Sequence, residues 1–380
     1  MLILLIIIAL FWFVALIDAA IGLRRLPRLE DSRPATEEPL LSVIIAARDE
    51  EQAIEQSIRS QLQQNYRNVE WIVVNDRSTD RTGEIIELLA AEDLRVQPVH
   101  INSLPSGWLG KNHALYNGYQ QANGDYLLFT DADVLYEKTA FQRAVSYIRQ
   151  TGVGHVTIAP QLTANTFWLQ GFIYFFLFGF GYFKRPWKAN DDRSRVAMGI
   201  GAFNLLTRSA YERIGTHEAI AMRPDDDLQM GVHVKKAGEK QRLLTAMSLI
   251  KVNWYNSLTD AIRGLEKNTL AGLYYRYWMV AVAAVGITVS HLLPFVMLFA
   301  GTPMQMWVSG STIVLMFLLY TLTTRQMAGA PPVHFIVMPI LTLLFIYTIV
   351  RAAILTKKRN GILWRGTHYT LDELRQNDKG

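Results

Sequence analysis

The chain contains no cysteine among its 380 residues. This absence excludes disulfides, thiolate metal sites and cysteine nucleophiles, and it fits a reducing compartment. The formal charge is only +5. No basic stripe alternates with aromatic residues in the polar part of the sequence, so we expect no nucleic-acid partner. The segment Gly107–Lys111 lacks the full spacing of a phosphate-binding P-loop and does not support an ATPase.

Charged residues are missing from long stretches near both ends of the chain. Residues 1–23 carry one charge, Asp18, and residues 277–324 and 333–350 contain no Asp, Glu, Lys or Arg. These stretches are long enough to cross a bilayer, and the second is long enough for two crossings with a break near Gly301. We therefore predict one N-terminal membrane span and three C-terminal spans, at about 278–300, 306–324 and 333–355.

The first apolar run is followed, not preceded, by basic residues, namely Arg24, Arg25 and Arg28. A cleaved signal peptide has the reverse order, so we interpret the run as a retained anchor. The positive-inside bias then places the next domain in the cytoplasm, in a multi-pass protein of the inner membrane. Four spans would put the basic residues 357–359 on the opposite side, so either one C-terminal span is re-entrant or the bias fails here.

The polar middle of the chain alternates short β-rich runs with helical patterns. This alternation is typical of βαβ units and predicts an α/β fold with a parallel sheet. The predicted strands are 41–46, 69–75, 94–100 and 126–129, and the predicted helices are 51–62, 81–91 and 111–122.

These patterns divide the chain into six parts. We expect an N-terminal anchor, a linker, an α/β domain interrupted by an aromatic segment at 167–183, a membrane-interface segment, a bundle of three spans and a basic tail. Their bounds are 1–23, 24–40, 41–250, 251–277, 278–355 and 356–380.

Acidic residues follow three of the predicted strands. Asp131 and Asp133 come directly after the strand that ends at Phe129, and their i, i+2 spacing places both side chains on one side of an extended chain. Asp49 and Asp76 follow the first two strands. Ligands bind outside the carboxyl ends of strands in open α/β sheets. Helix capping explains Asp49 equally well, but it does not predict a carboxylate at every strand end.

The order of these motifs resembles the family 2 glycosyltransferases with a GT-A fold, over roughly residues 40–235. The N-terminal anchor and the C-terminal spans are further similar to the ceramide glucosyltransferase-like branch, whose acceptors include ceramide, hopanoid and carotenoid lipids. The matching motifs are Val43–Glu51, Val73–Thr82, Gly110–Leu115, Asp131–Asp133 and Asp225–Gly231.

The resemblance implies a nucleotide-diphosphate sugar donor, with UDP as the usual nucleotide, a Mg²⁺ or Mn²⁺ ion, and inversion at the anomeric carbon. It assigns Asp133 to the metal and Asp131 to the metal or the ribose. The resemblance assigns the donor contacts to the first acidic motifs and to Lys111. Alternatively, Lys111 is a solvated residue at a helix start. These donor-binding candidates are Arg48, Asp49, Glu50, Asp76 and Lys111.

The resemblance also places the general base in the acidic motif that begins at Asp225. Alignment makes Asp227 the base and Asp226 the acidic residue before it, although a slip by one position stays open. An inverting transfer needs a base beside the acceptor hydroxyl. Three adjacent carboxylates repel one another, which raises the pKa of one of them.

The sequence departs from processive and ceramide-type relatives in one motif. These relatives carry a Q-x-x-R-W segment after the base, and this chain has none. The nearest equivalent, 263–268, offers Arg263 or Lys267 to the donor diphosphate. The tail 364–369 resembles a tryptophan–arginine–tyrosine ending of the branch, without an assigned role.

The aromatic segment 167–183 is the part of the sequence that we expect to contact the acceptor. We interpret it as an interfacial or re-entrant segment that guides a lipid hydroxyl, with a buried core helix as the alternative. A glycine-rich turn at 198–204 lines a ligand or is a plain turn. We expect transfer of one sugar to a membrane lipid; the alternatives are a processive polysaccharide synthase and a membrane scaffold with a decayed transferase domain.

Overall fold

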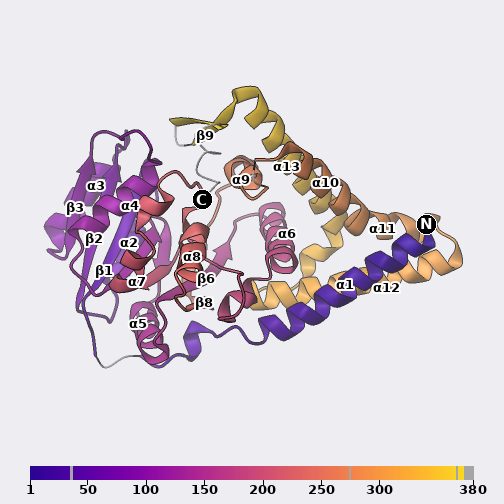
Figure 1. The fold of residues 1–380 in the computed structure, drawn as a ribbon, viewed down its shortest axis with the longest axis horizontal. Coiled ribbons are helices and arrows are strands. Elements are labelled where there is room, and N and C mark those ends of the chain that lie inside the picture. The colour runs from indigo at the N-terminus through magenta and orange to yellow at the C-terminus, as the bar shows by residue number, and fades with distance from the viewer. Residues whose placement is uncertain (35–36, 274, 365–366, 372–380) are drawn as a thin grey trace. The chain divides into compact units, whose positions relative to one another are not determined.

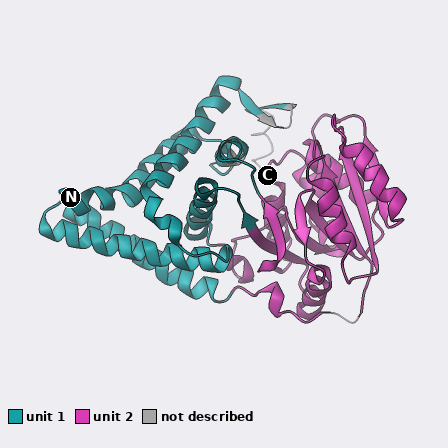
Figure 2. Ribbon diagram, turned by 180° about the vertical axis from the view of Figure 1, so that it is seen from behind, with its two compact units in different colours: residues 1–25, 162–185, 254–380 teal, residues 26–161, 186–253 magenta. Residues whose placement is uncertain are grey.

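The computed structural model describes residues 1–34, 37–273, 275–364 and 367–371. The side chains of a few further residues also lie outside the description, namely Lys267, Asn268, Ala271, Leu363, Trp364 and Thr367. The chain divides into two compact units (Figure 2). We call residues 1–25, 162–185 and 254–380 the helical unit, and residues 26–161 and 186–253 the sheet unit.

The sheet unit is built on a mixed sheet with the strand order β3-β2-β1-β4-β7-β6-β8-β5 among the described residues (Figure 1). Strands β3, β2, β1 and β4 are parallel, whereas β7 pairs antiparallel with both β4 and β6. The strands are β1 (Leu41–Ala47), β2 (Val69–Asp76), β3 (Val96–Ile101), β4 (Tyr126–Asp131), β5 (Val134–Tyr136), β6 (His155–Thr163), β7 (Asn204–Thr207) and β8 (Gln241–Asn253).

The prediction of a parallel sheet is therefore correct for one half of the sheet and wrong for the other. Parallel neighbours need a crossover that packs back on the sheet. The helix between β6 and β7 belongs to the helical unit, so it supplies no such crossover. The two strands meet antiparallel instead.

The parallel half brings three strand ends to one edge. Strand β1 is nearly all buried, as expected of a central strand covered on both faces. Its Ala46 pairs with Val74 of β2 and with Asp131 of β4. The loops that carry the acidic motifs after these strands therefore start side by side.

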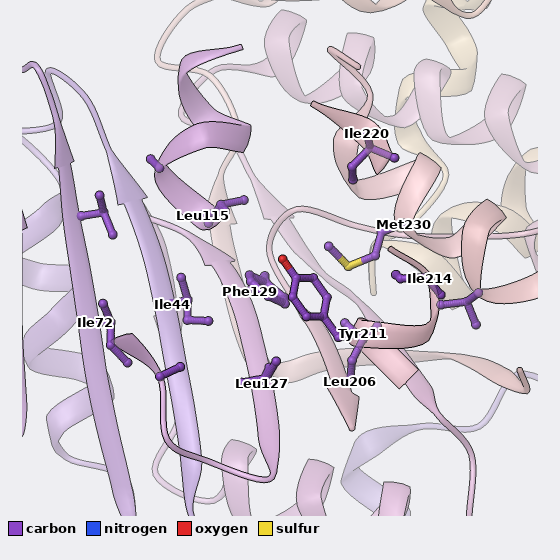
Figure 3. Packing of buried hydrophobic residues seen from close by; sticks show 14 of the residues in the cluster. Ile44, Ile72, Leu115, Leu127, Phe129, Leu206, Tyr211, Ile214, Ile220 and Met230 are labelled. Carbon is purple, nitrogen blue, oxygen red and sulfur yellow. The ribbon is translucent and has the colours of Figure 1, made fainter. Parts of the chain in front are cut away.

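Helices cover this sheet and close its core. Helix α4 packs on β1 and β2, and α3 packs on β2 and β3. Figure 3 shows part of the core, where Phe129 of β4 lies against Tyr211 of α7, with ring centroids 4.9 Å apart. The helices of the unit are α2 (Ile54–Leu62), α3 (Thr82–Glu92), α4 (Gly110–Gln121), α5 (Ala140–Thr151), α7 (Arg208–Arg213), α8 (Asp226–Lys236) and the 3₁₀ segments Leu29–Asp31, Pro186–Asn190 and His217–Ile220.

Part of the expected linker 24–40 packs on the sheet. Leu29 is fully buried, Arg28 forms a bridge with Thr245, and Glu30 accepts a hydrogen bond from the Ser248 hydroxyl at 3.0 Å. Residues 26–34 thus belong to the sheet unit. The abundance of proline and charge hid this docking because only two buried leucines, Leu26 and Leu29, contribute to the core.

The helical unit contains four helices among the described residues that are long and apolar enough to cross a membrane. They agree with the four predicted spans to within a few residues, and the second contains a π-helical turn at Thr288–Leu292. The spans are Leu2–Leu23 (α1), Tyr277–Ala300 (α10 and α11), Pro303–Met327 (α12) and Val333–Arg359 (α13 with a preceding 3₁₀ turn).

The aromatic segment forms helix α6 (Phe167–Lys184) inside the helical unit. It packs against α12 and α13, and Phe172, Phe175 and Phe178 are buried. Arg185, just after its end, forms an ion pair with Asp18 of α1. Helix α9 (Leu258–Ala271) and the hairpin β9 (Gly361–Trp364) and β10 (Thr367–Thr370) complete the described part of this unit.

Candidate functional site

The site begins at the end of β4. Asp131 is the last residue of this strand, and Asp133 follows after the buried Ala132. Both carboxylates are partly exposed while Ala132 is 3% exposed. Ala132 and Asp133 form the turn between β4 and β5, so the extended chain expected through Asp133 ends at Asp131. The pair is thus held rigidly at the edge where the parallel strands end.

Lys111, in the first turn of α4, lies among these carboxylates. Its Nζ is 2.7 Å from Oδ1 of Asp131 and 3.4 Å from Oδ2 of Asp226. Burial lowers the pKa of Lys111, but the charges of Asp131, Asp226 and Asp227 outweigh burial and raise it above its ordinary value. Lys111 is therefore a fixed cation that links the end of β4 to the start of α8, and the alternative of a solvated lysine is wrong.

The three consecutive aspartates at the start of α8 have three different partners. Asp225 accepts two hydrogen bonds from Arg223, at 3.0 and 3.1 Å. Asp226 is 5% exposed and faces Lys111. Asp227 accepts the main-chain N–H of Gly201 at Oδ2, at 2.9 Å. The acidic motif is thus divided into one carboxylate bound to arginine, one paired with lysine and one held by a peptide.

Asp227 has the chemistry of a proton acceptor. Burial and then the neighbouring charge of Asp226 raise its pKa to about 6, against the opposing effect of Lys111. The side chain keeps some exposed surface. A carboxylate with a pKa near neutrality is a stronger base than an ordinary aspartate and is still ionised at pH 7.

A glycine-rich turn, Met198–Phe203, connects these groups. The N–H of Gly201 reaches Asp227, and its carbonyl oxygen accepts the N–H of Asp131 at 3.1 Å. A β-carbon at Gly199 would overlap the carbonyl oxygen of Asp227, and one at Gly231 would overlap that of Met198. Glycine is required at both positions because the turn and α8 approach backbone to backbone. The turn is therefore a fixed part of the site.

Asp76, at the end of β2, is held by its own neighbour. It is 3% exposed and accepts hydrogen bonds from Nε and Nη2 of Arg77, at 2.7 and 3.0 Å. A β-carbon at Gly110 would overlap this pair. Gly110 directly precedes Lys111, so the Asp76–Arg77 pair lies next to the start of α4.

The loops after β1 and β2 are interlocked. Asp49, at a positive φ of 54°, accepts the N–H of Thr79 at 2.7 Å, and the N–H of Glu50 donates to Thr82 Oγ1 at 2.8 Å. The Nε of Arg48 lies 4.0 Å from the Asp49 carboxylate. Asp49 thus has a structural role in fixing the two loops, and the donor contacts predicted for Arg48, Asp49 and Glu50 remain predictions.

Two predicted donor ligands belong to the helical unit. Arg263 is an exposed residue of α9. Lys267 lies in the same helix, and its side chain is outside the described residues. Their contact with the donor diphosphate stays a prediction.

The sequence motifs did not disclose the role of Asn112. This residue is fully buried, and its Nδ2 lies 2.8, 3.1 and 2.9 Å from the carbonyl oxygens of Ile220, Ala221 and Arg223. Asn112 therefore holds the segment that leads into the acidic motif. Its place beside Lys111 in Gly110–Leu115 was the available signal.

The carboxylates of the site suit a divalent ion that takes most of its ligands from the substrate and from water. Among the residues that the structure describes, no group of three or more His, Cys, Asp or Glu side chains could hold a metal. Asp131 and Asp133 nevertheless offer carboxylate oxygens at one strand end, and Mg²⁺ is commonly bound by one or two carboxylates together with substrate phosphates and water. The residues thus fit a metal that arrives with a diphosphate.

The family comparison agrees with this geometry. Residues 42–215 match the model of glycosyl transferase family 2. This part of the chain is therefore similar to a family 2 glycosyltransferase domain. The matched range contains all strands of the parallel half, the Asp131–Asp133 pair and the glycine-rich turn, and it ends before the acidic motif at the start of α8.

Several curated relatives share part of the chain. A 4,4'-diaponeurosporenoate glycosyltransferase of Staphylococcus haemolyticus is 39% identical over 122 residues, which are 32% of this chain and 32% of the relative. A probable glycosyltransferase of Bacillus subtilis, YdaM, is 28% identical over 217 residues, 55% of this chain and 50% of the relative. The chain thus spans half or less of the length of these relatives.

A solved structure has the same fold over nearly the whole chain. It is a mannosyltransferase from Pyrobaculum calidifontis in complex with GDP-Man and Mn²⁺, with a TM-score of 0.54 and 18% identity. The match covers 94% of this chain and 98% of that chain. Together with the family match, this supports a GT-A type α/β core with one N-terminal and three C-terminal apolar helices.

Proposed function

We propose that this protein transfers a single sugar from a nucleotide-diphosphate sugar to a hydroxyl group of a membrane lipid, with inversion at the anomeric carbon. Asp227 is the general base. Asp226 and Lys111 set its charge environment, and Asp76 with Arg77 faces the nucleoside. UDP is the expected nucleotide, although GDP is bound by the structural neighbour.

One observation carries the proposal. The N–H of Gly201 bonds the carboxylate of Asp227, and its carbonyl oxygen accepts the main-chain N–H of Asp131. A transferase must place a base for the acceptor and an anchor for the leaving diphosphate at a fixed separation. Here one residue, Gly201, joins the candidates for both through two consecutive peptide groups. A decayed domain has no need to keep Asp131, Asp226, Asp227 and Lys111 in one charge cluster.

In this proposal Asp227 takes the proton of the acceptor hydroxyl as that oxygen attacks the anomeric carbon. The bond from the sugar to the diphosphate breaks on the opposite face, and the nucleoside diphosphate leaves. Asp131 and Asp133 would hold a Mg²⁺ or Mn²⁺ ion, which neutralises the charge of the leaving diphosphate when it is bound. Lys111, which already pairs with Asp131, adds a second positive charge at the same end of the site.

A lipid acceptor is supported by two independent observations. Four helices in the described chain are apolar enough to cross a membrane, and α6 adds an aromatic helix to the same unit. Relatives from two Staphylococcus species are named as 4,4'-diaponeurosporenoate glycosyltransferases, a name that indicates a carotenoid-type acceptor. We therefore propose a lipid of the class used by the ceramide glucosyltransferase-like branch, and an inner-membrane enzyme whose sheet unit lies in the cytoplasm.

The experiment that tests the proposal uses the full chain in lipid nanodiscs. Radiolabelled UDP- and GDP-sugars are supplied with Mn²⁺ and a total bacterial lipid extract, and the glycosylated lipid is identified by mass. We expect one added sugar per lipid. A ladder of longer products would instead support a processive synthase, and the absence of both transfer and donor hydrolysis with every donor would overturn the enzymatic assignment.

A further inference from the structure

A network of buried polar side chains contacts the glycine-rich turn. Its members are His155, Thr157, Asn204 and Gln241, from β6, β7 and β8, and each is at most 2% exposed. None of them was singled out from the sequence as a site residue. Buried polar groups are costly unless each is hydrogen-bonded, so a fully satisfied network indicates a specific geometry that an apolar core would not impose.

Gln241 holds one end of the turn through both groups of its amide. Its Oε1 accepts the N–H of Met198 at 3.0 Å, and its Nε2 donates to the carbonyl oxygen of Met198 at 3.0 Å. The side chain therefore binds Met198 as a neighbouring strand would. The same Nε2 lies 3.1 Å from Nδ1 of His155.

His155 links Gln241 to Asn204 through its two ring nitrogens. Because Gln241 donates to its Nδ1, the proton of the ring is on Nε2, which donates to Oδ1 of Asn204 at 3.1 Å. Burial lowers the pKa of His155 to about 4, so the ring is neutral and this tautomer persists near pH 7. Asn204 Oδ1 also accepts the N–H of Ile200, at 3.4 Å.

The middle and the far end of the turn are held in the same way. Thr157 Oγ1 accepts the N–H of Ile200 at 3.0 Å and donates to the carbonyl oxygen of Phe203 at 3.0 Å. The hydroxyl groups of Thr130 and Tyr136 donate to the carbonyl oxygen of Ala202, at 2.9 and 2.7 Å. Backbone groups on both sides of Gly201 are thus fixed by side chains, while the N–H of Gly201 bonds Asp227 and its carbonyl oxygen bonds the N–H of Asp131.

We propose that Gln241 and His155 are positioning residues for the transfer reaction: through the turn Met198–Phe203 they hold the Asp227 carboxylate at a fixed place relative to Asp131. This inference rests on the proposed function, because the network is proposed to keep the distance between the base, Asp227, and the diphosphate anchor, Asp131, constant. It predicts that loss of the network lowers kcat while the nucleotide still binds.

The test compares variants of the full-length protein in nanodiscs. Gln241→Met has a similar volume but cannot bond Met198, and His155→Phe keeps a ring without its nitrogens. His155→Gln retains a donor for Asn204. The matched control is Gln61→Met: Gln61 is also fully buried in the sheet unit, but it bonds Trp71 and Ser57 in a different region.

We expect Gln241→Met and His155→Phe to lower kcat by about 10- to 100-fold, because small displacements of reacting groups cost that much. The KM for the donor, and the affinity for UDP or GDP with Mn²⁺ measured by calorimetry, should change less than about threefold since the β2 and β4 strand ends are untouched. His155→Gln should recover a large part of the loss. Gln61→Met should lower the melting temperature and leave kcat within about twofold.

The outcomes separate the two proposals. If wild-type protein binds no nucleoside diphosphate and transfers no sugar, the proposed function fails. If wild type is active and Gln241→Met or His155→Phe retains its kcat, the positioning role is wrong while the proposed function stands. Equal losses in Gln241→Met and Gln61→Met at matched melting temperatures would also overturn the positioning role, since they would reflect stability alone. If Gln241→Met does not fold, the comparison of His155→Phe with His155→Gln tests the positioning role.

Discussion

The main-chain N–H of Gly201 donates to Oδ2 of Asp227 at 2.9 Å. This hydrogen bond directs one carboxylate oxygen into the turn and leaves the other at the start of α8, where it accepts the N–H of Leu228 at 2.8 Å. Both bonds favour the ionised form of the carboxylate, while burial favours the neutral form. The balance places the pKa of Asp227 at about 6, which suits a group that accepts a proton near neutral pH.

Replacing Asp227 by asparagine should abolish transfer and leave the donor bound. The amide keeps the shape of the side chain but cannot accept a proton, so we expect kcat to fall by about 10²- to 10⁴-fold. Affinity for the nucleoside diphosphate should stay within a few-fold in a calorimetric titration. Asp225→Asn is the control, because Asp225 pairs with Arg223 and Gln229; a comparable loss of kcat there would argue for the alternative register of the motif.

The rate should depend on pH through the same group. Asp227 must be ionised to accept a proton, so activity is present above its folded pKa of about 6 and declines as the pH falls below it. The limiting slope on the acidic side should be about tenfold per pH unit. Initial rates between pH 4.5 and 8 at saturating donor check this, and a flat profile across pH 6 would exclude Asp227 as the base.

The site motifs that the sequence revealed are local ones. Asp131 and Asp133 could be predicted because a strand end followed by two carboxylates is visible within a few residues. The acidic motif at Asp225 was recognisable for the same reason, and the four membrane spans follow from charge-free length. These features need no knowledge of which distant segments meet.

What could not be predicted depends on contacts between distant segments. In the sequence Lys111 fits a diphosphate ligand and a solvated residue equally well, and its pairing with Asp131 and Asp226 cannot be predicted because the three lie on separate elements. The antiparallel half of the sheet was missed because the helical pattern after β6 docks in the other unit. The network around His155 looks like ordinary strand sequence until β6, β7 and β8 are brought together.

Replacing Lys111 by methionine should move the acidic limb of the rate profile to higher pH. The charge of Lys111 lowers the pKa of Asp227, so its removal leaves Asp226 and Asp131 to repel the ionised base and raises that pKa. Activity at pH 6 should fall more than activity at pH 8. Lys138→Met, at an exposed position, is the control and should keep the wild-type profile. An unchanged limb in Lys111→Met would contradict the charge cluster.

Replacing Asp133 by alanine should remove the dependence on divalent metal together with activity. Asp133 and Asp131 offer the carboxylate pair at the end of β4, and losing one of two protein ligands weakens a site that relies on the diphosphate for the rest. We expect donor hydrolysis to fall to background, and Mn²⁺ to no longer increase the affinity for UDP or GDP. Asp125→Ala, at an exposed position just before the same strand, serves as the control. Wild-type activity that persists in excess EDTA would count against the metal.

Replacing Gly199 by alanine should disturb both stability and catalysis. The added β-carbon would overlap the carbonyl oxygen of Asp227, so the turn or the first turn of α8 has to shift. We expect the free energy of unfolding to fall by about 1–3 kcal/mol, as for other overpacked sites. We also expect a lower kcat at unchanged nucleotide affinity. Thermal unfolding and steady-state kinetics measure the two effects.

The matched control for this substitution is Gly179→Ala in helix α6. No atom lies within 4 Å of a β-carbon at Gly179, and alanine is favoured over glycine in a helix by about 1 kcal/mol. The melting temperature of this variant should be equal to or above that of wild type, with kcat retained. If Gly199→Ala behaved like Gly179→Ala, the close approach of the turn to Asp227 would not matter for the reaction, and the argument that the turn positions the base would be lost.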